Sequence, residues 1–478
     1  MPGNFPDIMP LRTTCLLAFA LPFAGNATIW TVGPGQTWTL PSQVSTLVAD
    51  GDTVNIEAGV YPSDVARWQA DDLLLRGVGG FAHLESNGLS YGDKAIWVIQ
   101  GDRTRVEWIE FSECVVPDHN GAGIRLEGLG LTVLNCHFHH NEMGILCGEY
   151  HPCTVRIEHT EFDHHGYGDG YSHNVYIGHV DSLIFRYNYS HHAFIGHELK
   201  SRAWVNVIEY NRLSNEADGE ASREIDLPNG GQAYLIGNVI QQGPQSQNSN
   251  IVGFGMEGLS NPGPQELYAV NNTLVNEKVN GSFFQSPAEI LFKAYSNVLA
   301  GGGAFMETWP GSLDTLANLR TMDISSIGFT DAVNYDYHID EGSPAHNLGF
   351  PAGLASSGYP LVALYEYVHP TGGVLRCQHA TLDAGAFETC TTGIEESEAT
   401  VMAIYPNPAT DLLTIRMPSG ATITAVEFID AQGQVVLRAA GHARELARLS
   451  VGELAPGCFN VRVSTSAGTW HRTFVKAP

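Results

Sequence analysis

The stretch VNVIEYN, residues 205–211, alternates apolar side chains with others and ends on an asparagine. The same pattern recurs in LIFRYN (183–188), QAYLIGN (232–238), ELYAVNN (266–272) and EILFKAYSN (289–297). The final asparagines, Asn188, Asn211, Asn238, Asn272 and Asn297, are 23, 27, 34 and 25 residues apart. Alternation at this interval, without helical periodicity, predicts a solenoid whose coils are short strands joined by turns. Because one coil cannot bury its inner face alone, we expect stacked coils to share a core.

The repeated asparagine is expected at one fixed turn position of each coil. Asparagine tolerates a left-handed backbone and can hydrogen-bond to its neighbour one coil away. Phe111, Phe138 and Phe162, at intervals of 27 and 24 residues, extend the pattern upstream. A β-propeller is the competing architecture, but its blades need about 40 residues or more. We therefore predict an all-β chain whose body is a right-handed parallel β-helix, the hand following the usual sense of parallel crossovers.

Three further stretches carry a family resemblance. GDTVNIEAGVY (51–61) resembles the first coil, and NYDYHIDEGSPAHNLG (334–349) with DAGAFE (383–388) resembles the last coils, of secreted proteins in the pectate-lyase-like superfamily. The resemblance covers residues 28–390 and implies the right-handed β-helix fold. It is more specific for fold than for chemistry, because one fold hosts many functions.

A second unit follows the linker at 391–401. Residues 402–478 contain YPNPATDLLTI (405–415), GQVV (433–436), LAPGCFNVRV (454–463) and FVK (474–476). Short alternating strands and turns rich in Pro and Gly predict a small β-sandwich. The unit resembles the type A sorting domain of the type IX secretion system of Bacteroidetes, which implies export through that machinery to the outside of the cell or to its surface. A carbohydrate-binding module is the alternative.

The amino-terminal residues 1–27 predict a secretory signal peptide cleaved after Ala27, because one Arg precedes a short apolar run that ends in small residues. A buried helix is the alternative, and no other segment predicts a membrane span. Disulfides are allowed in an exported protein. Either Cys147 with Cys153 or Cys377 with Cys390 could form one, and no CxxC motif supports a zinc or iron–sulfur site.

The formal net charge of −27 is concentrated in residues 28–400, which hold 45 acidic and 16 basic side chains. Such a body disfavours nucleic acid as a partner. It would also repel an acidic polysaccharide unless a cation or a local basic cluster intervened.

One group of charged residues meets that condition. Alternation along HELKSRA (197–203) would turn Glu198, Lys200 and Arg202 to the outside. The same reasoning turns Asn174 and Tyr176 outward in the previous coil and Glu224 and Asp226 in the next. Glu257 would extend the group by a fourth coil. Stacking brings the members of this group within about 5 Å per coil.

The chemistry that such a group suits is β-elimination in a uronic-acid polymer. The reaction requires that the sugar carboxylate be neutralised, the neighbouring proton removed and the leaving oxygen protonated. Ca²⁺ held by Asn and carboxylate oxygens could neutralise the carboxylate, and a Lys or Arg could act as base. The arrangement resembles the chondroitinase-B-like alginate lyases.

That resemblance implies that Asn174 and Glu198 are calcium ligands and that Lys200 is the base. This sequence departs from the family in having one carboxylate before the Lys, so Glu224 or Asp226 would have to complete the metal site. The resemblance implies that the family's Arg corresponds to Arg223, but strand parity turns Arg223 inward. Either Arg223 lies in a bulge, or Arg202 takes the role of that Arg.

The remaining candidates are accessory. Tyr176, His192 and His197 could return the proton, and the aromatic loop 166–174, with Tyr171, could stack on sugar rings. Asn229 lies in the turn DLPNGG (226–231), a candidate for substrate contact although the pattern is typical of a plain turn. The pairs His139-His140, His164-His165 and His191-His192 recur every 25 and 27 residues and predict a stack at one corner. It could be a transition-metal site, a proton donor or a hydrogen-bonded turn ladder.

The leading hypothesis is a secreted polysaccharide lyase that acts on an acidic, uronate-containing glycan. A C5-epimerase shares its first step. A glycoside hydrolase using Glu198, Glu224 and Asp226 is the runner-up. A glycan-binding solenoid without activity, and a plain surface charge ladder, are the other interpretations.

Overall fold

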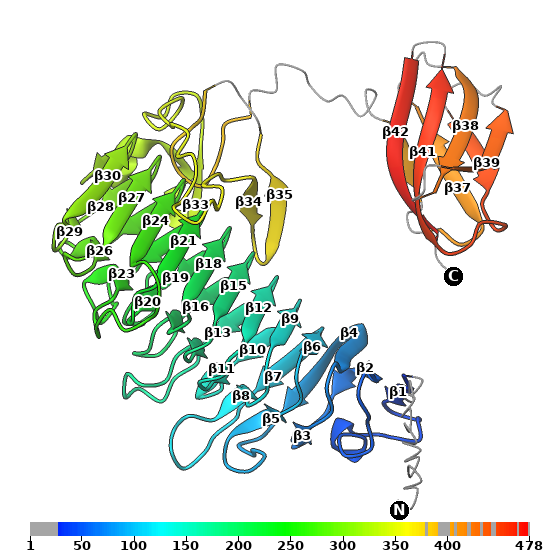
Figure 1. The fold of residues 1–478 in the computed structure, drawn as a ribbon, viewed down its shortest axis with the longest axis horizontal. Coiled ribbons are helices and arrows are strands. Elements are labelled where there is room, and N and C mark those ends of the chain that lie inside the picture. The colour runs from blue at the N-terminus through cyan, green and yellow to red at the C-terminus, as the bar shows by residue number, and fades with distance from the viewer. Residues whose placement is uncertain are drawn as a thin grey trace, which may run out of the picture. The chain divides into compact units, whose positions relative to one another are not determined.

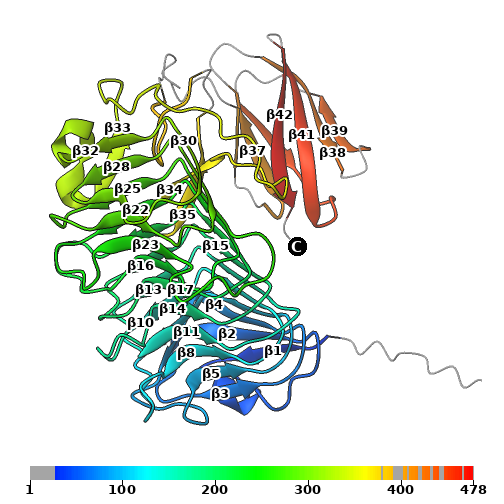
Figure 2. The same cartoon turned by 60° about the vertical axis from the view of Figure 1, so that its left-hand side comes forward.

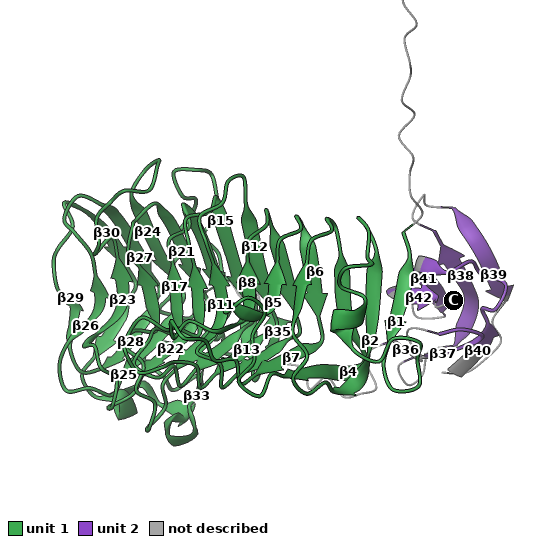
Figure 3. Cartoon of the chain, turned by 90° about the horizontal axis from the view of Figure 1, so that it is seen from below, with its two compact units in different colours: residues 1–389 green, residues 390–478 purple. Residues whose placement is uncertain are grey.

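The computed structural model describes residues 27–377, 381–390, 402–405, 409–417, 422–430, 434–440, 446–465 and 468–476. The predicted signal peptide up to Asn26 and the linker at 391–401 lie outside these ranges. Contacts divide the chain into two compact units, residues 1–389 and 390–478 (Figure 3). The described ranges contain no helix that is both long and apolar enough to cross a membrane.

The first unit is a parallel β-helix, as predicted (Figures 1 and 2). Its strands form three rows, and each row pairs in parallel with the same row of the next coil. The first row contains β1 Ile29–Val32, β2 Thr53–Val60, β4 Leu74–Glu85, β6 Thr104–Glu107, β9 Leu131–Leu134, β12 Thr154–Glu158, β15 Ser182–Arg186, β18 Val205–Glu209, β21 Gln232–Ile236, β24 Glu266–Val270, β27 Leu291–Tyr295 and β30 Ser312–Leu316.

The second row continues from the ends of β2 and β4, which bend round the corner and join both rows into one sheet. It contains β7 Ile109–Ser112, β10 His137–His139, β13 Glu161–Asp163, β16 Tyr189–His191, β19 Arg212–Ser214, β22 Val239–Gln242, β25 Thr273–Asn276, β28 Val298–Gly301 and β31 Leu319–Thr321.

The third row is a separate sheet of ten strands among the described residues. It contains β3 Ala66–Trp68, β5 Ala95–Ile99, β8 Ala122–Leu126, β11 Met143–Cys147, β14 Val175–Ile177, β17 Leu199–Ser201, β20 Ile225–Leu227, β23 Asn250–Phe254, β26 Ser282–Gln285 and β29 Ala304–Met306.

The predicted asparagine ladder lies at the corner between the first and second rows. The Oδ1 of Asn211 accepts from the backbone N–H of Asn188 at 2.9 Å, and the Oδ1 of Asn238 accepts from the N–H of Asn211 at 3.0 Å. The same bond repeats through Asn272, Asn297 and Asn318. The left-handed residue is not the ladder asparagine but the residue before it, as at Tyr210 with φ 58°.

The core of the solenoid is continuous and apolar. Phe111, Phe138 and Phe162 stack with ring centroids 4.8 and 5.0 Å apart, as their spacing predicts. Cys147 and Cys153 are buried free thiols, so the disulfide considered between them is wrong. Cys377 and Cys390 are both disulfide-bonded.

Segments after the last coil cover two of the three rows. Residues Ala352 to Ala363 pack on first-row side chains such as Tyr210 and Tyr234. Ile327, Tyr337 and Ala384 pack on second-row valines. These segments include η2 Ile324–Ile327, η3 Ala332–Asn334, β32 Phe329–Asp331, β33 Asp336–Ile339, β34 Tyr365–Val368 and β35 Gly372–Leu375; η1 Pro41–Gln43 precedes β2. Neither cluster of described residues includes a third-row side chain, so these segments do not cover the outer face of that row.

The second unit consists of two antiparallel sheets around a core that includes Leu413, Phe428 and Phe474. One sheet contains β36 Ala403–Tyr405, β37 Leu412–Arg416 and β40 Leu446–Ser450, and the other contains β39 Val435–Ala440, β38 Ile423–Ile429, β41 Gly457–Thr465 and β42 Gly468–Lys476. Its alternating strands therefore fold as the predicted small β domain.

Candidate functional site

The open outer face of the third row carries a column of chemically active side chains. Tyr176 on β14 is in register with Lys200 on β17, and Lys200 is in register with Asp226 on β20. Arg125 on β8 and Leu146 on β11 continue the same column toward the amino terminus. Parallel strands place such neighbours about 5 Å apart. Tyr176, Lys200 and Asp226 thus share one outer face, as predicted, but Tyr176 and not the expected Asn174 is the register partner of Lys200.

A cleft of about 690 Å³ lies over this column. Arg125, Tyr176, Lys200 and Arg202 form its floor. Its walls are the loops between the second and third rows and between the third and first rows, with Glu257 at one end; they contribute Asp118, His119, Asn120, Asp169, Tyr171, His173, Gly148, Glu149 and His179. The Tyr171 side chain is 79% exposed at the wall, where an aromatic ring is free to meet a ligand.

Polar contacts hold the floor of the cleft together. The Lys200 ammonium lies 3.2 Å from Glu257 and 3.5 Å from Asp226. The Arg202 guanidinium donates to the Tyr176 hydroxyl at 2.9 Å and pairs with Glu257 at 2.7 Å. Glu257 thus extends the group by a coil, as predicted, and bridges its two cations.

Arg125 differs from the other cations of the cleft. It has no ion-pair partner among the described residues, and its Nε is buried without a hydrogen-bond partner. The charge of Arg125 acts on Glu127 without a direct ion pair, and a partly desolvated guanidinium in this state favours an anion that approaches from the cleft.

Two stacked histidines lie beside the column. The rings of His173 and His197 are 4.8 Å apart. The Nδ1 of His173 accepts from the backbone N–H of His197, and the Nδ1 of His197 accepts from that of Arg223. Burial, with the nearby charges of Lys200 and Arg223, lowers the pKa of His197 well below its ordinary value. Both imidazoles are therefore neutral, with Nε2 carrying the proton.

The outward orientation predicted for Asn174, Glu198 and Glu224 is wrong. All three side chains are completely buried inside the solenoid. The reason is that β14, β17 and β20 begin only at Val175, Leu199 and Ile225. Each predicted outward residue therefore lies in the turn before its strand, where alternation does not yet apply.

The buried carboxyl groups belong to an internal polar network. Glu198 accepts from Asn174 Nδ2 at 2.5 Å, Ser190 Oγ at 2.9 Å and the backbone N–H of Ala193 at 3.0 Å. Burial outweighs these hydrogen bonds and raises the pKa of Glu198 to about 8. The pKa of Glu224 is also raised, first by burial and then by the nearby Glu198.

The expected calcium ligands do not make one site. Asn174, Glu198 and Glu224 point into the core, whereas Asp226 points outward and is already paired with Lys200 and Arg223. Ca²⁺ takes six to eight oxygen ligands and needs ionised carboxylates. The internal group offers instead two carboxyl groups with raised pKa values. These residues do not fit the ion.

Three of the remaining predicted residues have clear positions. Arg223 faces outward rather than inward, because it precedes β20, and donates to Asp226 at 3.0 Å and to Gln285 at 2.7 Å. The His197 Nε2 lies 3.6 Å from Asp226. Asn229 accepts a hydrogen bond from Arg202 and donates to Ser260, so it positions Arg202.

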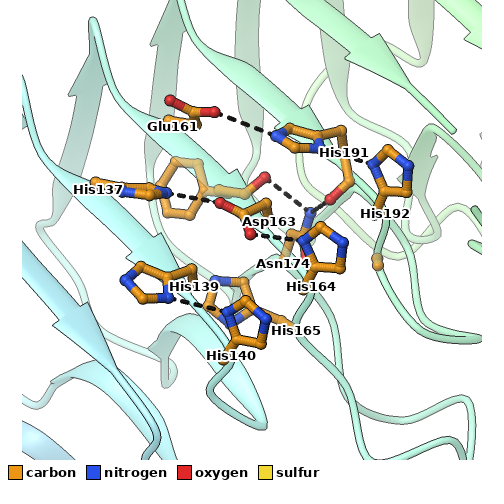
Figure 4. A network of polar contacts seen from close by, with 12 residues as sticks. His137, His139, His140, Glu161, Asp163, His164, His165, Asn174, His191 and His192 are labelled. Carbon is orange, nitrogen blue, oxygen red and sulfur yellow. Dashed lines mark hydrogen bonds and ion pairs between the residues drawn. The ribbon is translucent and has the colours of Figure 1, made fainter. Parts of the chain in front are cut away.

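His192 lies elsewhere. It belongs to a turn ladder in which the rings of His140 and His164 stack at 5.1 Å and those of His164 and His192 at 4.9 Å. All three residues have φ near 53°. Figure 4 shows the ladder beside His165, which is buried and has its pKa lowered to about 3 by burial. The predicted histidine stack is confirmed, and it lines a depression separate from the Lys200 cleft.

Sequence reasoning missed Arg125 and His173. Within AGIRLEG (122–128), Ile124 and Leu126 are buried and Arg125 faces outward, a pattern that alternation could have revealed. Its alignment with Tyr176 was hidden, because the long loops after β11 and β13 make the coil lengths unequal. His173 precedes a strand, as Glu198 does, and gave no comparable signal.

Comparison with known proteins gives a family match for the second unit. Residues 403–477 match the family model of the secretion system C-terminal sorting domain. This match covers the tail alone. No curated protein matches the chain. The protein is thus a β-solenoid exported by the type IX secretion system of a Bacteroidetes-type bacterium, either secreted or held at the cell surface.

Proposed function

We propose that the cleft over β8, β11, β14 and β17 binds an acidic, uronate-containing polysaccharide and cleaves it by β-elimination. The observation that carries this proposal is the gathering of Arg125, Lys200 and Arg202 in one cleft beside Tyr176. The chain as a whole has a net charge of −27. A cluster of three cations on the floor of one cleft, within such a field, is a feature that favours an anionic substrate.

Binding begins with the sugar carboxylate. Arg125 lines the cleft, forms no ion pair among the described residues and has an Nε without a hydrogen-bond partner, so it can hold such a carboxylate. Arg202 lines the cleft, where Tyr176, Asn229 and Glu257 hold its guanidinium, and a substrate carboxylate would displace Glu257. Guanidinium groups match a carboxylate through paired hydrogen bonds. Arg202 at the carboxylate would withdraw charge from the adjacent C5 and make its proton more acidic, while Arg125, three strands away from Lys200, would hold the carboxylate of another sugar of the same chain.

The proton transfer falls to Lys200 and Tyr176, which are neighbours in one column. Lys200 first releases its ammonium proton to water, and the neutral amine then takes the C5 proton; the released electron pair forms the C4–C5 double bond as the C4–O bond breaks. Tyr176 gives its phenolic proton to the leaving oxygen, and the hydrogen bond from Arg202 Nε at 2.9 Å stabilises the phenolate that remains. A water molecule or Lys200 then restores that proton.

The wall of the cleft supplies sugar contacts. Tyr171 is exposed, and Tyr167 stacks on His119 with ring centroids 3.5 Å apart. Such rigid rings suit the apolar faces of sugar residues. Because the cleft runs across successive coils, it can accommodate a linear polymer.

Hydrolysis is the second candidate function, and one observation favours it. Asp226 and Glu257 both contact the Lys200 ammonium, at 3.5 and 3.2 Å, so two carboxylates flank one cation. Glycosidases use such a pair. Glu198 and Glu224, expected earlier to take part, are buried in the core and do not reach the cleft.

The test is an assay of the full chain on alginate, pectate and glycosaminoglycans. Elimination gives an unsaturated product that absorbs in the ultraviolet, and we expect Lys200→Ala and Tyr176→Phe to lower its rate by at least about 100-fold. Lys293→Ala is the matched control, because Lys293 lies on β27 and pairs with Asp314. New reducing ends without absorbance would instead show hydrolysis.

Two other outcomes would also overturn the lyase. Inverted C5 stereochemistry in NMR spectra of an uncleaved polymer would identify an epimerase. Binding that leaves every polymer unchanged would identify a glycan-binding protein without activity.

A further inference from the structure

A second group of ligating side chains lies on the outer face of the second row, away from the cleft. His83 on β4 is in register with Glu110 on β7. Glu110 is in turn in register with His137 on β10 of the next coil, and His139 lies two residues after His137 on that strand. One ligand atom from each of His83, Glu110 and His139 lies within 4.8 Å of the others. Three consecutive coils thus bring two imidazoles and one carboxylate together.

The contacts within this group leave a space between its ligand atoms. The His139 Nε2 lies 3.0 Å from the Glu110 carboxylate, and the His83 Nδ1 lies 3.9 Å from it. The two imidazole rings have centroids 5.6 Å apart and are tilted by 45°. Their side chains are 18% exposed, and that of Glu110 is 23% exposed. The group is therefore partly desolvated and still open to an incoming ion.

The outer nitrogen of each imidazole has its own partner. Ser112 Oγ lies 2.8 Å from His83 Nε2, and His140 Nδ1 lies 2.9 Å from His139 Nδ1. When these partners accept the ring N–H, the lone pairs of His83 Nδ1 and His139 Nε2 face Glu110. A partner on the second nitrogen is the usual support of a metal-binding histidine, because it fixes both the tautomer and the ring orientation.

In a neighbouring group, both oxygens of one carboxylate are already paired with histidines. Asp163 lies between His137 and His164, 2.6 Å from a nitrogen of each (Figure 4). Glu161 contacts His191 at 3.3 Å. Both oxygens of Asp163 are thus already engaged by imidazole N–H groups, and His137, Glu161 and Asp163 are accounted for as ion pairs. Glu110 has only one such short contact, with His139 at 3.0 Å, because His83 and His137 each lie 3.9 Å from its carboxylate.

We propose that His83, Glu110 and His139 form a binding site for a divalent transition-metal ion, with Zn²⁺ as the reference ion. Two imidazoles and a carboxylate are a donor set that zinc and its first-row neighbours accept, whereas Ca²⁺ prefers oxygen ligands alone. Three protein ligands leave a fourth position for water or a substrate atom. The site is independent of the lyase proposal, since its residues lie on another face.

The test measures Zn²⁺ binding to the full chain, prepared without a polyhistidine tag and stripped of metal by chelation. Isothermal titration should give one tight site, and excess Ca²⁺ should not compete. In the His83→Gln/His139→Gln variant the Kd should rise on the order of 10-fold or more. His164→Gln/His192→Gln is the matched control, because it removes two imidazoles from the same face and should bind as the parent does.

Electron paramagnetic resonance of bound Cu²⁺ gives a second readout, with two coupled imidazole nitrogens expected in the parent. If His83→Gln/His139→Gln fails to fold, Glu110→Gln replaces it, with the same expected loss of affinity. Absence of tight binding would overturn the site. An equal loss of affinity in the test and control variants would also overturn the site, because it would show binding by dispersed surface histidines. A loss of affinity confined to the control variant would overturn it as well, because the ion would then lie at Asp163.

Discussion

Glu198 and Lys200 are separated by one residue in the sequence and lie on opposite sides of the solenoid wall. The Glu198 side chain is completely buried and bonded to Asn174, Ser190 and Ala193, while the Lys200 ammonium lies in the cleft beside Glu257. A strict strand would place both on one face. The turn that ends at Leu199 instead separates a core acid from a surface cation.

The buried acid leads to a prediction about stability. Burial raises the pKa of Glu198 from 4.5 to about 8, so the folded chain holds a proton that the unfolded chain releases. This contribution to stability is present below pH 4.5 and is lost as pH rises through 8. We expect the free energy of unfolding to fall over that window, by at most about 1.4 kcal/mol per pH unit for this group.

Glu198→Gln should flatten this dependence and raise stability near pH 8, because a neutral amide mimics the protonated acid. Urea unfolding at a series of pH values measures how the free energy of unfolding depends on pH in the parent and in the variant. Glu289→Gln, at an exposed position, is the control. A variant that keeps the parent's slope would show that Glu198 is not the titrating group.

Glu257 leads to a prediction about affinity. Burial opposes its ionisation, but hydrogen bonding to Arg202 and the charge of Lys200 dominate and lower the pKa of Glu257. Its carboxylate therefore occupies the position that a substrate carboxylate would take. In Glu257→Gln the KM for an acidic polymer should fall roughly two- to fivefold, the value of an exposed ion pair. An increased KM would mean that Glu257 itself binds the sugar.

Metal removal is the third prediction. The residues expected to hold calcium are either inside the core or already paired with cations. We therefore expect polymer cleavage to proceed at an unchanged rate after treatment with a calcium-selective chelator. Loss of activity that added Ca²⁺ restores would point to a calcium site built from other groups, such as Asp118 and Asp169 in the cleft wall.

The asparagine ladder gives the fourth prediction. Asn238 is buried, accepts from both nitrogens of Asn211, and donates to Ile208 O at 2.8 Å and to Asn272 Oδ1 at 2.9 Å. Asn238→Ala leaves these partners unsatisfied and should lower the free energy of unfolding by about 3 kcal/mol. Asn280→Ala, at an exposed position, should have almost no effect. Chemical denaturation compares them, and equal values would argue against the ladder as a source of stability.

The sequence predicted the features that depend on period and failed on those that depend on where a strand begins. The spacing of Asn211 and Asn238, and the alternation around Lys200 and Tyr176, repeat from coil to coil and could be extrapolated. The inward orientation of the Glu224 side chain could not be predicted, because it depends on β20 beginning one residue after Glu224. Loop length is the second obstacle, since the unequal insertions before Tyr176 concealed its alignment with Arg125.

The ladder of asparagines has a direction. Each Oδ1 accepts from the backbone amide of the coil before it, so the amide of Asn188 depends on Asn211 and that of Asn211 on Asn238, whereas each Nδ2 donates to a carbonyl of the coil before it. A nascent chain would therefore carry one unmet amide at its growing end until the next coil arrives. Cutting the solenoid between two rungs recreates that unmet backbone amide on the amino-terminal fragment and leaves a side-chain amide without its acceptor on the other. Whole coils could be inserted or deleted without leaving such an unmet amide, so the fold can change its length by whole coils.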